Sequence, residues 1–206
     1  MFEKLYELRA ETIAVLVLLV ISSIFIFILL KKGKLKMGTR VIVYAGLCIS
    51  LSFVLSSIRI IRMPQGGSVT PASMLPLFIF AFIFGPLPGI LAGMAYGFLQ
   101  LLQDAFVVHW AQLILDYPLA FAAIGIAGCF KRFRTIGILS GAVTKTFFRV
   151  LSGFIFFSEY APEGQNAVIY SIIYNGTFMS VETAITIVLA IPILAALGRA
   201  GKLRRA

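Results

Sequence analysis

The chain has 206 residues, of which 60% are hydrophobic and only 13% are charged, and it carries a formal net charge of +10. A mean hydropathy of +1.01 excludes an ordinary soluble globular domain and indicates an integral membrane protein. In such a protein a basic excess is a signal of orientation, so the charge predicts no nucleic-acid partner. Cys48 and Cys129 lie in separate apolar stretches without a CxxC spacing, which predicts neither a disulfide nor a metal site.

Transmembrane helices are predicted from apolar runs and from the residues that interrupt them. The first two cover residues 12–30 and 41–58, with the basic run "KKGKLKMGTR" between them. A Gly/Pro-rich loop follows at residues 59–73. The uncharged stretch beyond it divides into two helices at "GPLPG" (residues 85–89), because proline does not fit a helix interior. The last three helices are expected near residues 112–130, 135–157 and 167–197.

Basic residues gather in three segments without any acid, "KKGKLKMGTR", "KRFR" and "GRAGKLRR". Loops that remain in the cytoplasm are enriched in Lys and Arg, so all three segments are predicted to be cytoplasmic. The acids outside the spans lie in the other loops and in the N-terminal segment. This distribution predicts a multi-pass protein with its N-terminus outside the cell and its C-terminus in the cytoplasm.

Four ionisable residues fall inside the predicted spans: Asp116, Lys145, Arg149 and Glu182. A charge at a helix centre costs about 2.5–3.5 kcal/mol on insertion scales, so such residues usually face the bundle interior and serve a function. Helical rise places Lys145 and Glu182 at similar depth, which predicts an ion pair between them. Asp116 and Arg149 lie nearer the outer surface.

A small-molecule pocket is predicted at that outer level. One helical stripe of the sixth span carries Lys145, Arg149, Gly153 and Phe157. The neighbouring spans add a carboxylate, phenol rings and an amide at similar depth, from Asp116, Tyr117, Tyr170, Tyr174 and Asn175. This combination favours a flat, cationic ligand, although tyrosines are also common at membrane interfaces. The loop at residues 59–73 lies on the same side and is expected to fold over the ligand.

Four ordered motifs carry a family resemblance: "MPQGGSVTPASMLP", "LDYPLAF", "SGFIFFSEYAPEGQN" and "YSIIYNGT". They resemble the thiamine-specific S-components (ThiT) of energy-coupling factor (ECF) transporters. The resemblance implies a subunit in the bacterial cell membrane that captures thiamine from outside. Delivery would pass through a transmembrane coupling subunit and two ATPase subunits. By position, the implied ligand-binding residues are Asp116, Tyr117, Arg149, Gly153, Phe157, Tyr170 and Asn175.

The expected fold is therefore an all-α integral membrane protein. Residues 37–206 would form the six-helix vitamin-binding domain. Residues 1–36 would hold an extra transmembrane helix and a basic cytoplasmic loop, which the six-helix family plan lacks. Two site residues also depart from the family pattern: Arg149 stands where the motif has histidine, and Phe157 where some members have tryptophan.

Partner contacts are expected on the second helix, where Gly46 and Ser50 form a small-residue face that permits close helix approach. In the family such a face contacts the coupling subunit, although packing within the chain is the alternative. The sequence has no G-x-x-x-x-G-K-[ST] loop, so ATP hydrolysis is assigned to partners and the chain is predicted not to be an enzyme. No cofactor is expected, with thiamine as the transported ligand.

Three other functions are alternatives to this one. A membrane hydrolase is disfavoured, since His109 has no HExxH or GxSxG context and no catalytic or metal residues are predicted. A secondary vitamin carrier coupled to protons through Asp116 and Glu182 is the stronger rival. An S-component for a related pyrimidine or thiazole ligand is the third.

Overall fold

The computed structural model describes residues 38–199, and the predicted helix at residues 12–30 lies outside them. The described helices are α2 (Thr39–Ser57), α3 (Leu75–Phe84), α4 (Pro86–Asp104), α5 (Trp110–Ile114), α6 (Ala120–Ala122), α7 (Arg134–Phe156) and α8 (Ala167–Arg199). Between α2 and α3 lies a hairpin of β1 (Ile61–Arg62) and β2 (Ser68–Val69). Short helical turns complete the chain: η1 (Pro64–Gly66), η2 (Leu115–Leu119), η3 (Ala123–Cys129) and η4 (Ser158–Tyr160).

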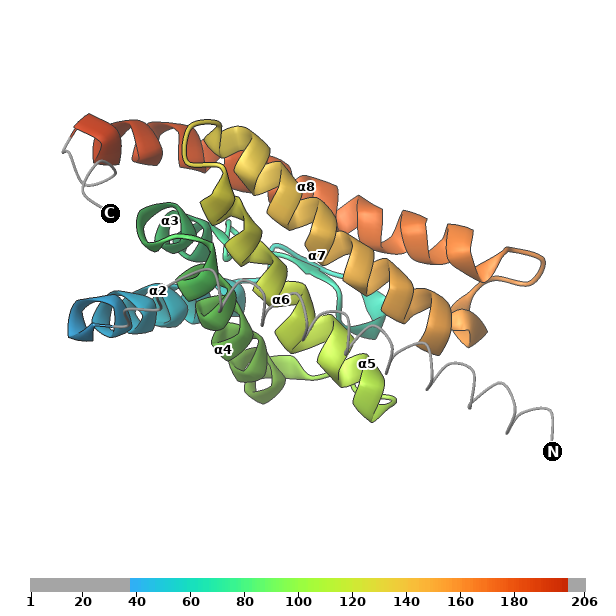
Figure 1. Cartoon of the computed structure of the whole chain (residues 1–206). Coiled ribbons are helices and arrows are strands. Elements are labelled where there is room, and N and C mark those ends of the chain that lie inside the picture. Colours follow the sequence, from blue (N-terminus) through green and yellow to red (C-terminus); the bar gives the residue numbers. More distant parts are fainter. Residues whose placement is uncertain (1–37, 200–206) are drawn as a thin grey trace. The chain divides into compact units, whose positions relative to one another are not determined.

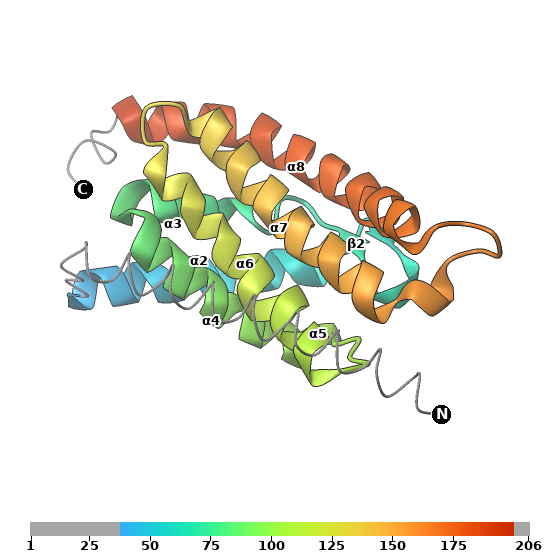
Figure 2. The same cartoon turned by 45° about the vertical axis from the view of Figure 1, so that its right-hand side comes forward.

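Four described helical runs are long and apolar enough to cross a membrane: α2, the run Trp110–Cys129, α7 and α8. They confirm the predicted class, an all-helical membrane protein. In both views α7 lies between the α5–α6 run and α8, and α4 lies on the other side of that run (Figures 1 and 2). The run Trp110–Cys129 is the most buried of the four, so it forms the centre of the bundle.

The predicted break at "GPLPG" separates α3 from α4. Gly85 ends α3 with φ 96°, a conformation that glycine adopts without strain. Pro86 and Pro88 then fall in the first turn of α4, where backbone N–H groups have no acceptor within the helix. A local backbone signal therefore decides this boundary.

Helix α3 begins and ends close to the predicted positions and is short for a membrane span. Its 10 residues extend about 15 Å, half of a typical hydrocarbon core. The loop before it is buried instead, including Thr70, Ser73 and Met74. Irregular backbone is tolerated at membrane depth only where protein covers it and satisfies its polar groups. The sequence analysis predicted a loop at residues 59–73 but did not foresee that its last residues are buried.

A proline shapes the central run. Pro118 lies inside a helix and cannot donate a hydrogen bond, and the chain adopts one turn of π-helix at η2 around it. Asp116 and Tyr117 belong to this turn. Such π-turns are common at functional sites because they redirect side chains.

Glycines bring α4 against the central run. Gly89, Gly93 and Gly97 recur every fourth residue on α4, a pattern typical of close helix packing. A Cβ added at Gly93 would lie 2.2 Å from the carbonyl oxygen of Phe121. The sequence analysis singled out Gly46 instead, where an added Cβ would meet nothing within 4 Å.

Candidate ligand-binding site

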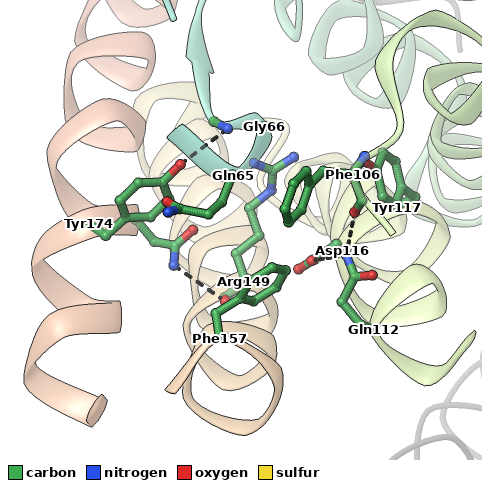
Figure 3. A pocket seen from close by; sticks show the side chains of 11 residues that line it. Gln65, Gly66, Phe106, Gln112, Asp116, Tyr117, Arg149, Phe157 and Tyr174 are labelled. Atoms are coloured by element: carbon green, nitrogen blue, oxygen red, sulfur yellow. Dashed lines mark hydrogen bonds between the residues drawn. The ribbon is translucent and has the colours of Figure 1, made fainter. Parts of the chain in front are cut away.

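A cavity of about 50 Å³ lies where the central run, α7, α8 and the hairpin meet. It is called the outer cavity because the sequence analysis predicts these residues near the outer surface. Figure 3 shows side chains from these elements projecting toward the same space. The lining residues are Gln65, Gly66, Gly67, Phe106, Gln112, Asp116, Tyr117, Arg149, Phe157, Tyr174 and Asn175. Six residues that the sequence analysis placed in the pocket are among them: Asp116, Tyr117, Arg149, Phe157, Tyr174 and Asn175.

Asp116 is held by a neighbour in its own helical run. Gln112 Nε2 donates to Asp116 Oδ2 at 2.6 Å and to the Phe106 carbonyl at 3.1 Å. Gln112 also accepts from the Val108 N–H at 3.2 Å, so the amide is fully oriented. The sequence analysis did not identify this neighbour, although the i, i+4 spacing of Gln112 and Asp116 indicates one. The carboxylate remains beside the cavity with one oxygen bound to Gln112.

Aromatic rings line the cavity around this acid. Phe106 and Phe157 lie with ring centroids 5.8 Å apart, and the Tyr117 hydroxyl accepts from the Phe106 N–H at 3.0 Å. Phe157 and Tyr117 are largely buried. A carboxylate among ring faces is a favourable environment for a planar cation, through charge attraction and cation–π contact.

The hairpin closes the cavity on another side. The Tyr174 hydroxyl donates to the Pro64 carbonyl and accepts from the Gly67 N–H at 3.3 Å. An added Cβ at Gly67 would lie 2.8 Å from that hydroxyl, so a larger residue there would displace the Tyr174 side chain from this contact. The chain between β1 and β2 is thus attached to α8 while Gln65, Gly66 and Gly67 line the cavity. The sequence analysis placed a loop here but did not foresee the hairpin.

Arg149 is the unusual member of the site. Its guanidinium lies over two rings, with Cζ 5.8 Å from the Phe121 centroid and 5.6 Å from the Phe178 centroid. It forms no ion pair with Asp116 in the described part of the chain, and its buried Nε has no hydrogen-bond partner there. The aromatic contacts therefore account for its position.

Two residues that the sequence analysis predicted for the site do not line the outer cavity. Gly153 faces α8, because an added Cβ would lie 2.2 Å from Ser171 Oγ. It allows α7 and α8 to approach each other. The Tyr170 ring is tilted against the Tyr174 ring, with the centroids 6.0 Å apart, and Tyr170 does not line the cavity. Asn175 lines the cavity but directs its amide nitrogen to the Ser171 carbonyl at 3.1 Å.

The predicted Lys145–Glu182 ion pair is absent from residues 38–199. Glu182 Oε1 instead accepts from Thr70 Oγ1 at 2.6 Å and from Ser73 Oγ at 3.1 Å. Lys145 Nζ lies 3.0 Å from Met74 Sδ and 4.1 Å from the Phe121 ring centroid. The prediction was wrong because helical depth does not show that a buried loop lies beside the carboxylate and supplies its hydrogen bonds.

This fold defines a multi-pass helical membrane protein with a small cavity lined by charged, polar and aromatic side chains. Residues 42–200 match the family model described as thiamine transporter protein (Thia_YuaJ). The chain is 39% identical over 136 residues to the thiamine transporter ThiT of Bacillus subtilis, covering 58% of this chain and 70% of that protein. It is 31% identical over 135 residues to the thiamine transporter ThiT of Lacticaseibacillus paracasei, covering 56% and 67% respectively.

A solved structure of ThiT from Listeria monocytogenes has a similar fold. Its TM-score is 0.68 at 24% identity, and the match covers 79% of this chain and 96% of that chain. The chain belongs to the thiamine transporter protein family. This is a family of transporters and not of enzymes.

Proposed function

We propose that this chain is the substrate-binding membrane subunit of an ATP-driven vitamin importer, capturing thiamine from the extracellular side. The observation that carries the proposal is the outer cavity, where the Asp116 carboxylate lies among the rings of Phe106, Tyr117 and Phe157. Thiamine combines a cationic aromatic ring with a second polar ring, which suits a site of this composition. Membership of a family of thiamine transporters supports the same ligand.

The direct test is calorimetric titration of the detergent-purified protein with thiamine. Saturable binding with one site per chain is expected, and no heat of binding would contradict the proposal. A variant that removes the Asp116 charge makes the test specific to this cavity and is argued in the Discussion.

Energy for uptake is assigned to partner proteins: an ECF transmembrane coupling subunit and two ATPase subunits. Gly46 and Ser50 are both exposed on α2, and an added Cβ at Gly46 meets no other atom within 4 Å. The α2 surface around them is apolar, with Val43, Leu47 and Val54 more than half exposed. A small-residue face within an apolar helix surface permits close approach by a partner helix.

Gly46→Leu is expected to weaken assembly with these partners without changing thiamine affinity. The added side chain projects from α2 and prevents close helix approach, while nothing inside the described chain opposes it. The measurement is the amount of coupling subunit and ATPases recovered with a tagged chain. Val188→Leu, at a position 66% exposed on α8, is the matched control. If wild type and Gly46→Leu recover equal amounts of the partner subunits, this face of α2 does not contact them.

The orientation of the chain is also a proposal, with the N-terminus outside and the C-terminus in the cytoplasm. It rests on the basic segments, including "KRFR" between η3 and α7. Phe133 in this segment is 58% exposed and Glu163 in the α7–α8 loop is exposed, so each can carry a cysteine probe. In a background without Cys48 and Cys129, an impermeant maleimide should label Glu163→Cys in intact cells. Phe133→Cys should react only after permeabilisation, and the reverse pattern would overturn the orientation.

A further inference from the structure

A groove between α7 and α8 takes no part in the candidate ligand-binding site. In both views the two helices lie side by side (Figures 1 and 2). The longer stretch of the groove has a volume of about 650 Å³, with Ala142 and Val143 of α7 and Gly176 and Ala184 of α8 in its lining. A shorter stretch of about 270 Å³ continues toward the start of α7 and shares Ile187 with the first. The two stretches together are called the α7–α8 groove.

The longer stretch of this groove is apolar and lies on the outside of the bundle. Val143 in its lining is 66% exposed, and both helices are long and apolar enough to cross a membrane. Two hydroxyl groups of the lining are already satisfied within their own helices. Thr146 Oγ1 donates to the Ala142 carbonyl at 2.8 Å. Ser180 Oγ donates to the Thr177 carbonyl at 2.9 Å. This stretch therefore suits a hydrocarbon occupant.

The shorter stretch of the groove ends in positive charge. Arg132 and Arg134 line it at the start of α7. Arg132 is exposed, and Arg134 Nη1 donates to the Leu194 carbonyl at 3.5 Å. The lining of both stretches contains no acid, and the first turn of α7 has none either. The two guanidinium groups therefore carry charge that no residue of the groove neutralises.

The dimensions of the groove match one lipid chain in one leaflet. A leaflet has about 15 Å of hydrocarbon, half of a typical membrane core. From Arg134 to Val143 helix α7 rises about 14 Å, and from Leu194 to Ala184 helix α8 spans about 15 Å. A chain that starts beside the arginines therefore reaches the apolar stretch and ends within it.

We propose that the α7–α8 groove binds one anionic phospholipid, with its headgroup phosphate at Arg132 and Arg134 and one acyl chain in the apolar stretch. Charge-assisted hydrogen bonds from the guanidinium groups hold the phosphate. Basic pockets between transmembrane helices bind anionic headgroups in this way. A protein helix could cover the apolar stretch but supplies no anion for the two arginines. The groove is separate from the outer cavity, so the inference does not rest on the proposed function.

Native mass spectrometry of the detergent-purified chain tests the headgroup site. The probe is phosphatidylglycerol, compared with phosphatidylcholine that has the same acyl chains. Each arginine near a membrane surface favours an anionic lipid by about 5-fold, so wild type should bind phosphatidylglycerol roughly 30-fold more tightly. Arg132→Gln with Arg134→Gln should abolish this preference. Arg132→Gln alone, at an exposed position, should lower it by about 5-fold should the double variant fail to fold.

Arg40→Gln is the matched control for Arg132→Gln. It removes one exposed arginine at the start of α2, outside the groove, and should leave the preference unchanged. An equal effect of the two variants would overturn the proposal, because lipid would then respond to surface charge in general. Equal binding of both lipids to wild type would overturn it as well.

Ala184→Phe tests the apolar stretch while both arginines remain. The added ring fills the groove at the depth of the acyl chain, so binding of phosphatidylglycerol should be lost. Val188→Phe places a ring on α8 outside the groove lining and should bind the lipid as wild type does. Unchanged lipid binding in Ala184→Phe would overturn the proposal. Loss of a copurifying subunit or of a dimer in that variant, with lipid binding unchanged, would assign the groove to a protein helix instead.

Discussion

Asp116→Asn is expected to weaken thiamine binding by roughly 10- to 150-fold. The carboxylate lies beside the outer cavity, and an interaction with a ligand cation is worth about 1.5–3 kcal/mol in a desolvated site. Asparagine has nearly the same shape, and its carbonyl oxygen can still accept the Gln112 hydrogen bond that now measures 2.6 Å. The variant therefore changes the charge and little else. Calorimetric titration with thiamine measures the effect.

The fold of Asp116→Asn should be preserved. Arg149 forms no ion pair with Asp116 among the described residues, so the substitution leaves no stranded cation. We expect a melting temperature equal to or above that of wild type, since a carboxylate in an apolar bundle is costly. Glu163→Gln, which removes an acid from the exposed α7–α8 loop, is the matched control and should bind thiamine normally. A folded Asp116→Asn with unchanged affinity would show that the acid does not serve the ligand.

Gly93→Ala is expected to lower the stability of the fold. The new Cβ would lie 2.2 Å from the Phe121 carbonyl oxygen and 2.9 Å from its carbonyl carbon, both backbone atoms. Relief requires α4 to move away from the central run, and overpacking of this kind costs about 3 kcal/mol. The higher helix propensity of alanine stabilises the folded state by about 1 kcal/mol. The net loss of about 2 kcal/mol corresponds to a melting temperature lower by about 4–8 °C.

Gly46→Ala is the matched control for that experiment. Both glycines lie within helices, but an added Cβ at Gly46 contacts nothing within 4 Å. We expect its melting temperature to be unchanged or slightly raised, because only the propensity gain applies. Thermal unfolding in one detergent compares the two variants. Equal melting temperatures would show that α4 and the central run adjust without cost.

Much of the candidate site could be predicted from the residues. Asp116, Tyr117, Arg149, Phe157 and Asn175 all line the outer cavity. Polar and charged residues in apolar spans are costly, so they usually turn toward the interior. Helical periodicity then shows which of them share a face, as on α7. This reasoning missed Gln112, which lies one helical turn from Asp116, and Phe106, which lies in a connecting segment without such periodicity. The loop that contains Gln65, Gly66 and Gly67 was expected over the ligand only as a whole segment.

The positions of the helices follow from local sequence alone. The boundary between α3 and α4 depends on Gly85 and Pro86, and the lengths of the other spans follow from apolar runs that partition into hydrocarbon. These signals lie within a few consecutive residues, or within the apolar run of a single helix. No contact with distant parts of the chain is needed for them.

Tertiary packing decided which polar groups became partners. Glu182 binds Thr70 and Ser73 instead of Lys145, because a buried loop occupies the space beside α8. Gly153 admits Ser171 of the neighbouring helix, and Arg149 lies over Phe121 and Phe178. Each contact depends on how helices and loops far apart in the chain approach one another. Helical depth and spacing along one segment carry no information about that approach, so these contacts appear only in the folded structure.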